Sequence, residues 1–160
     1  MDLTALKQAL ADLLKGAPGL AGAEILLAFP AGRHLPLQGA SILLGVDALE
    51  LTSGGLGGLC LGQGGSPASI TVRLDIFAPD RSGGDLDQLF EAVCAALAQS
   101  AARLGISRIW REHLAWDDGA NSYRLSARAL LQGRARAGSP REEVRGIEEV
   151  RLVRNDATGG

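Results

Sequence analysis

The chain has 160 residues, of which 46% are apolar and 21% charged, and its 16 basic and 18 acidic residues leave a net charge of -2. This composition is typical of one soluble globular domain, and the lack of a basic excess argues against a dedicated nucleic-acid binder. Two cysteines without a CxxC spacing, Cys60 and Cys94, exclude a disulfide scaffold. No apolar run approaches the ~20 residues that cross a bilayer, and residues 1–15 do not resemble a signal peptide. We therefore expect no membrane partner and no export.

The N-terminal part of the chain predicts one helix followed by short strands. Leucines recur every three or four residues over 3–14, which predicts an amphipathic helix that the Gly/Pro-rich residues 16–22 end. The apolar run Glu24–Phe29 predicts a short strand. Ser41–Leu51 is also apolar but contains a glycine and an aspartate, which predicts one bent strand or two short ones.

The middle of the chain joins a glycine-rich segment to the clearest strand and helix patterns. Seven glycines and a proline in Ser53–Ser69 predict a mobile loop, and their spacing is not that of a phosphate-binding loop. Apolar and other side chains alternate strictly over Ile70–Phe77, which predicts a strand with one face in the core and the other wet or shared. An apolar stripe over Asp85–Arg103 predicts an amphipathic helix that closes at Gly105.

Two further strands end the predicted domain. Ile106–Trp116 and Ser122–Gly133 have strand patterns, and Asp117–Asn121 between them has the composition of a hairpin loop. After Gly133 arginines interleave with glutamates around few apolar residues, which predicts a charged arm over 134–160, either late-folding or disordered. The expected architecture is a single α+β domain over 1–133, with a mixed, mainly antiparallel sheet, two amphipathic helices packed on one face, and this C-terminal arm.

The residue types that carry catalysis or metal binding do not form a recognisable site. His34 and His113 lack a sequence partner for a triad or a metal centre. Asp117 and Asp118 lack the longer acidic pattern of a calcium loop and are expected to form a turn. Cys94 fits a small buried hydrophobe. We expect no catalytic site, no metal and no cofactor.

Four arginines could gather on one face of the predicted sheet: Arg73, Arg108, Arg124 and Arg128. A solvated face is the first interpretation, and a partner's carboxylates or phosphates are the alternatives, because guanidinium groups bind both.

A resemblance to a known family extends from Ile70 to Gly133, through ITVRLDIFAPDRSGGDLDQLFEAVCAALAQ and then ISRIWREHLAWDDGANSYRLSARALLQG. This stretch resembles the tail terminator, or tail completion, proteins of tailed bacteriophages and phage-tail-like particles. The similar features are the strand VRLDIFAP, a Gly/Asp turn into an amphipathic helix, and a closing hairpin in which WDD precedes YRLSA. The N-terminal helix also fits this family, whereas the charged tail after Gly133 departs from its compact pattern.

The resemblance implies a structural virion protein without enzymatic activity. Such proteins form a ring, usually a homohexamer, that caps the head-proximal end of the tail tube, ends its polymerisation and joins tail to head. The implied partners are further copies of the chain, the tail tube protein and the head–tail connector protein, with DNA only as passing cargo. The implied location is the head-proximal end of a virion tail assembled in the host cytoplasm. The candidate subunit or tube contacts are Arg73, Arg124, Arg128, Asp117 and Asp118.

Other functions remain as alternatives to the terminator. The nearest is another head–tail joining or baseplate component. From different classes come a dimeric adaptor and a small-molecule enzyme or binding domain, whose carboxylates Asp75, Glu112 and Asp117 would surround a deep pocket. A ring subunit predicts flat, continuous contacts instead.

Overall fold

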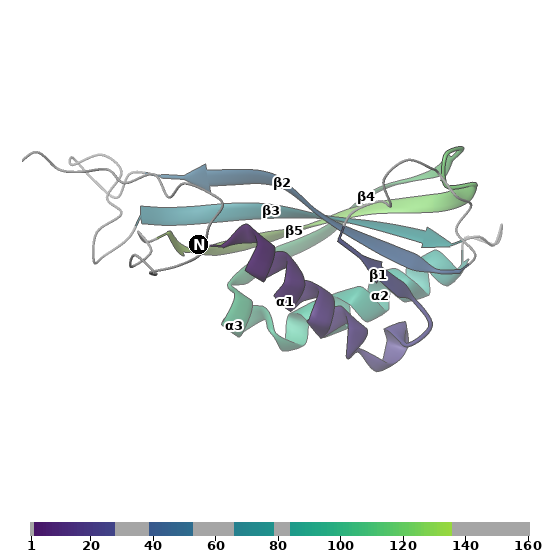
Figure 1. Ribbon diagram of the computed structural model, residues 1–160, viewed down its shortest axis with the longest axis horizontal. Helices are drawn as coiled ribbons and strands as arrows, with labels where there is room; N and C mark the ends of the chain where they lie inside the picture. The colour runs from purple at the N-terminus through teal and green to yellow at the C-terminus, as the bar shows by residue number, and fades with distance from the viewer. Residues whose placement is uncertain (1, 28–38, 53–65, 79–83, 136–160) are drawn as a thin grey trace, which may run out of the picture.

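The computed structural model describes residues 2–27, 39–52, 66–78 and 84–135, which form one sheet backed by one layer of helices (Figure 1). The elements in chain order are α1 (Leu3–Lys15), the 3-10 helix η1 (Pro18–Leu20), β1 (Glu24–Leu26), β2 (Ser41–Leu51), β3 (Ser66–Ala78), α2 (Gly84–Gln99), α3 (Ala101–Leu104), β4 (Ile106–Asp117) and β5 (Ser122–Ala135). The strand order is β1-β2-β3-β5-β4, in which β1 pairs with β2 in parallel and all other pairs are antiparallel. Helices α1 and α2 lie on the same face of the sheet, so the predicted α+β class is confirmed.

Helix α1 forms where its leucine spacing predicts it. Asp2 caps its start, because its Oδ1 atom accepts hydrogen bonds from the backbone N–H groups of Thr4 (2.9 Å) and Ala5 (3.2 Å). The buried side of the helix, with Leu10 and Leu14, faces α2, β1 and β2. Leu10, Ala11 and Leu14 of α1 belong to the main core. Among the described helices, none combines the length and the apolar character that crossing a membrane requires.

The strands differ from the sequence prediction mainly at their ends. β1 ends at Leu26, and β2 is one bent strand whose pairing with β3 shifts register between Val46 and Ala48. β3 begins at Ser66, so the last four residues of the predicted loop 53–69 are strand, whereas 53–65 lie outside the described residues. Ser66–Ser69 become strand because they pair with Gln132–Ala135 of β5, a long-range contact that outweighs the local proline and serine content.

The predicted second helix is interrupted near its end. α2 stops at Gln99 and the short α3 follows, so the predicted single helix to Arg103 was wrong in its last turn. Gly105 then ends α3 in the left-handed conformation (φ 68°), as a glycine after a helix commonly does. β5 extends through Arg134 and Ala135, two residues into the predicted arm, and 136–160 lie outside the described residues.

The main core lies between the helices and the sheet. Its centre is formed by apolar side chains that are 0–1% exposed: Leu14, Ile42, Leu44, Val72, Leu74, Ile76, Leu86, Val93, Leu97, Leu125 and Ala127. A second, smaller cluster of Leu43, Phe77 and Ala120 lies on the opposite face of the sheet. The expectation that this face of β3 is uniformly wet or shared needs correction, because Phe77 is 1% exposed and Asp75 4% exposed.

Candidate functional site

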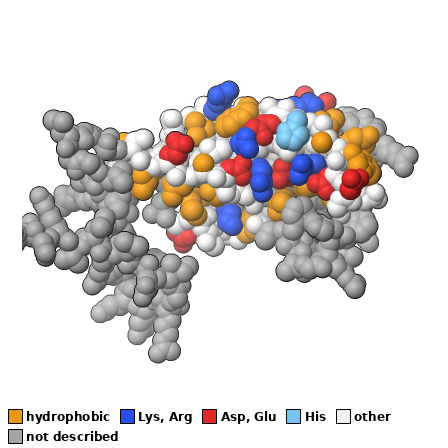
Figure 2. Space-filling model, turned by 90° about the horizontal axis from the view of Figure 1, so that it is seen from above, with side chains coloured by type: hydrophobic (Ala, Val, Ile, Leu, Met, Phe, Trp, Pro, Cys, Tyr) orange, Lys and Arg blue, Asp and Glu red, His pale blue; other side chains and the backbone are white. Residues whose placement is uncertain are grey.

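The sheet face opposite α1 and α2, which we call the open face, carries a band of alternating acidic and basic side chains (Figure 2). Its centre consists of Asp47, Arg73, Asp75, Glu112 and Arg128, which come from β2, β3, β4 and β5. Four strands therefore contribute to one surface. We call these five residues the charge network.

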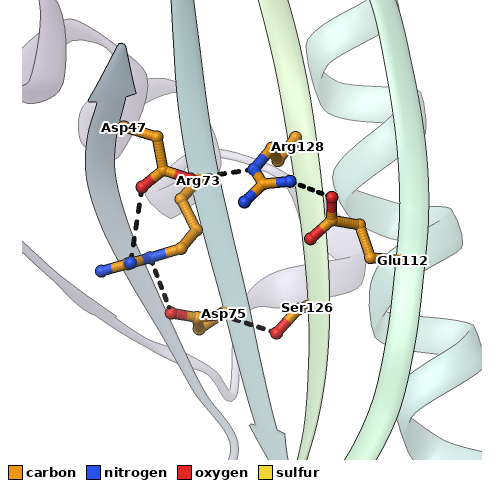
Figure 3. Close-up of polar contacts among 6 residues, drawn as sticks. All are labelled: Asp47, Arg73, Asp75, Glu112, Ser126 and Arg128. Carbon is orange, nitrogen blue, oxygen red and sulfur yellow. Dashed lines mark hydrogen bonds and ion pairs between the residues drawn. The ribbon is translucent and has the colours of Figure 1, made fainter.

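The charge network is a continuous chain of ion pairs (Figure 3). Arg73 contacts Asp75 (Nε to Oδ2, 3.0 Å) and Asp47 (Nη1 to Oδ1, 3.4 Å). Arg128 donates from Nε to Asp47 Oδ2 at 2.9 Å and from Nη1 to Glu112. The carboxylate of Asp75 is nearly buried, and its second oxygen accepts a hydrogen bond from the hydroxyl of Ser126 at 3.0 Å.

Strand register explains why the acids are needed at these positions. Arg73 lies directly opposite Arg128 in the β3–β5 pair, and like charges in that arrangement repel. Asp47 contacts both guanidinium groups and compensates this repulsion. The pKa of Arg128 is accordingly raised, first by its hydrogen bond to Asp47 and further by the charges of Glu112, Asp47 and Asp75, against an opposing effect of desolvation.

The outer acids of the charge network lie at strand irregularities. Asp47 lies where β2 shifts register between Val46 and Ala48, and Glu112 lies within the shift of β4 between Arg111 and Leu114. Asp47 comes two residues after Gly45, the partner of Arg73, and Glu112 comes two residues after Trp110, the partner of Arg128, so alternation along each strand places both carboxylates on the open face.

Arg73 lies across Gly45 of β2. The two residues are register partners, and a Cβ atom on Gly45 would lie 3.4 Å from Arg73 Nη2, at van der Waals contact with the guanidinium group. The glycine and the aspartate that interrupt the apolar pattern of β2 are thus both neighbours of Arg73 on the open face.

The hairpin between β4 and β5 holds a separate ion pair. Arg124 Nη1 lies 3.3 Å from Asp117 Oδ2, and the other oxygen of Asp117 accepts the backbone N–H of Ala120 at 3.0 Å. Asp117 thus acts as the predicted turn former. Asp118 is exposed beside it, and Arg124 Nε is buried without a hydrogen-bond partner in the described part of the chain.

The predicted contact residues therefore divide into two groups. Arg73 and Arg128 meet in the charge network, and Arg124 joins Asp117 in the hairpin. Arg108, at the other end of the open face, has its guanidinium 4.9 Å from the ring centre of Trp110. Sequence reasoning missed Asp47, for which the interrupted apolar pattern of β2 was the available signal, and Ser126, which alternates with the apolar residues of β5 as Arg124 and Arg128 do.

The other candidates lie away from the charge network. His113 is exposed on β4, whereas His34 and Cys60 lie outside the described residues. The Cys94 thiol is half-buried, and its pKa is raised first by desolvation and then by the charge of Glu91. Among the described residues, no group of three or more His, Cys, Asp or Glu side chains could hold a metal ion.

A pocket among the described residues lies on the helix side of the sheet, where α3 meets β5. It is lined by residues of α1, α3, β3 and β5 and of the α3–β4 junction: Leu6, Ile70, Ala102, Arg103, Leu104, Gly105, Leu131, Gln132 and Gly133. Asp75, Glu112 and Asp117 are not part of this lining. The carboxylates that the enzyme alternative requires therefore do not surround it.

No model of a known protein family matches the chain, and no curated protein sequence does. Its fold is similar to a chain in the virion of a native gene transfer agent particle, with a TM-score of 0.43 and 18% identity over 82% of this chain and 92% of that one. It is also similar to the sheath/tube terminator of the PVC extracellular contractile injection system in its extended state, with a TM-score of 0.46 and 11% identity over 96% of this chain and 66% of that one.

Proposed function

We propose that this chain is a structural protein of a phage-like particle, which caps the head-proximal end of a tail tube as a ring of identical subunits, ends tube polymerisation and joins the tail to the head. The observation that carries the proposal is the sequence resemblance over Ile70–Gly133. The resembling segments form the centre of the fold, because β3 pairs with β5 over Ser66–Ala78, β5 pairs with β4, and α2 packs against β3.

The open face offers a surface for such an assembly. The side chains of Arg73 and Arg128 are 45% and 35% exposed, so a partner can reach them although each is already paired with acids. A partner would meet a broad surface of compensated charge, which favours selective docking over strong attraction of any polyanion. We propose Arg73, Arg128, Arg124, Asp117 and Asp118 as residues of the tube or subunit contact.

Compensated charge also suits the passage of DNA. A lumen that carried a large excess of arginine would hold phosphates by releasing their counterions, and movement of the DNA would slow. The chain has a net charge of -2, and the open-face arginines Arg73 and Arg128 are neutralised by carboxylates of the same chain. The proposed partners are the tail tube protein and the head–tail connector, with DNA as cargo and the virion tail as location.

A tube-elongation assay tests this function. Purified tail tube protein from the same source genome is polymerised with and without this chain, and tube lengths are measured by electron microscopy. We expect shorter tubes that gold-labelled protein marks at one end only. Reversal of the open-face charges in Arg73→Glu/Arg128→Glu should weaken this effect, whereas Arg103→Glu on α3 serves as the exposed control. Tubes of unchanged length without terminal label would contradict the proposal.

A further inference from the structure

The sheet has a free edge on each side. β4 is the last strand of the described sheet along its whole length. On the other side β1 covers only Ser41–Leu43 of β2, so in the described part of the chain Leu44–Leu51 has no strand along its outer edge. The backbone N–H and C=O groups of such edges can pair with another strand.

The exposed apolar side chains lie on these same two strands. In the part of the chain that the structure describes, the large hydrophobic side chains that are exposed are Leu49 and Leu51 on β2 and Leu114 and Trp116 on β4, at 38–45%. One exposed leucine needs no explanation. Exposed apolar residues gathered on the free edge strands are typical of an interface, because native proteins usually protect such edges with charge.

Leu49, near the end of the free β2 edge, and Ile106, at the start of the β4 edge, lie in the same row across the sheet. Register partners connect Leu49 to Ile70, Ile70 to Leu131 and Leu131 to Ile106. Three successive antiparallel pairs also make β2 and β4 run in opposite directions. A second copy placed beside the first, with its sheet in the same orientation, would therefore bring its β2 edge antiparallel to the β4 edge.

This placement matches apolar with apolar side chains on the helix side of the sheet. Leu49 and Leu51 share a face with their partners Ile70 and Ala68, which is the face that α1 and α2 cover. Ile106, at the start of β4, lies on that face too, and it is partly buried against the main core. The neighbour's leucines would extend this core across the subunit boundary.

The same placement matches opposite charges on the open face. Glu50 lies opposite Ser69 and Arg108 opposite Leu130, both on the open face near that row. Within the described residues neither forms a salt bridge: Glu50 accepts the Ser69 hydroxyl at 3.5 Å, and Arg108 lies over Trp110. The other charges of these two strands have partners within the chain, as the charge network and the Arg111–Asp87 pair show.

We propose that the β2 edge of one copy docks antiparallel on the β4 edge of the next, shifted by two residues from the shared row, so that Leu51 lies opposite Ile106, Glu50 opposite Arg108 and Leu49 opposite Ile109. This inference rests on the proposed function, since it names the contact between the subunits of the ring. The two edges are different surfaces, so the contact is heterologous, and repeated contacts of this kind close into a ring when the rotation per subunit allows.

Charge reversal tests the Glu50–Arg108 pair. Glu50→Arg and Arg108→Glu each place like charges at the boundary and should weaken self-association about tenfold, whereas the double variant should recover most of the loss. Glu91→Arg, at an exposed acid of α2, is the matched control and should leave association unchanged. Association is measured by light scattering coupled to size exclusion over a range of concentrations. A double variant that associates no better than the single variants would overturn the pair.

Disulfide trapping tests the edge contact when association is weak. Cysteines are placed at both edges in Glu50→Cys/Arg108→Cys, in a background of Cys60→Ser and Cys94→Ser, and the oxidised protein is run on a non-reducing gel. We expect covalent oligomers that the control Glu91→Cys/Arg108→Cys does not form. If the parent forms oligomers in solution but the two edge cysteines form no covalent oligomers, this contact is overturned and the proposed function still stands. A parent that is monomeric throughout and is not trapped would contradict both.

Discussion

Gly105 is the position at which one added methyl group should disturb the fold most. It ends α3 with φ 68°, a conformation in which an L side chain is disfavoured by about 1–2 kcal/mol. A Cβ atom would also lie 2.1 Å from the backbone oxygen of Gln132, far closer than carbon and oxygen approach. The backbone of β5 would have to move, although the N–H of Gln132 donates to the oxygen of Gly105 at 2.7 Å.

We expect Gly105→Ala to lower the free energy of unfolding by about 2–4 kcal/mol, which adds the backbone strain to the displacement of one strand and its hydrogen bond. Gly16→Ala is the matched control, because Gly16 also follows a helix but has φ -80°, and its Cβ would meet Asp12 oxygen at 3.6 Å. The control should stay within about 0.5 kcal/mol of the parent or gain slightly.

Urea unfolding followed by far-UV circular dichroism measures both variants against the parent, with equal m values as the check that the comparison is valid. The reasoning would be refuted if Gly105→Ala and Gly16→Ala had the same midpoint, because the junction of α3 and β4 would then tolerate a side chain.

Three further perturbations follow from the structure. Gly19→Ala should destabilise the fold by about 1–3 kcal/mol, because its Cβ would lie 2.8 Å from that of Ala92, and adding Ala92→Gly should restore most of the loss in a double-mutant cycle. Burial raises the pKa of Cys94, and the charge of Glu91 raises it further. In a variant that lacks Cys60, alkylation of the Cys94 thiol should therefore be slower in the folded protein than in the unfolded chain. The thiol of the unfolded chain ionises at a lower pH than that of the folded protein. The stabilisation of the folded state by this pKa difference is therefore complete below the ordinary thiol pKa and is lost as pH rises through the raised pKa, and a pH series of urea midpoints checks this. Arg128→Met should lower stability, because Glu112 loses its cation and Asp47 keeps only Arg73, and the loss measured by urea unfolding should shrink in high salt.

The sequence predicted elements whose signal is local. The leucine spacing of α1, the alternation of β3 and the turn composition between β4 and β5 each determine a structure over a few residues. The start of β3 at Ser66 could not be predicted in this way, because those residues are held by partners in β5 more than sixty positions away. The break between α2 and α3 likewise has no glycine or proline to announce it.

The open face was predictable only up to its first irregularity. Period-two alternation correctly placed Arg73 and Arg128 on one face. Asp47 and Glu112 continue that alternation from Gly45 and Trp110, but each lies at a register shift after which the faces of its strand exchange, so one uniform period describes neither β2 nor β4 over its whole length. The ion pairs themselves join strands whose order in the sheet depends on long-range pairing, which a single sequence pattern does not specify.

The mass of the protein in solution, measured by light scattering with negative-stain images of the same fractions, tests the proposed ring most directly. For a chain of 16.6 kDa, six copies correspond to about 100 kDa, and we predict this mass together with annular particles. A stable dimer that forms no ring, even when it is mixed with tail tubes, would contradict the account and favour an adaptor.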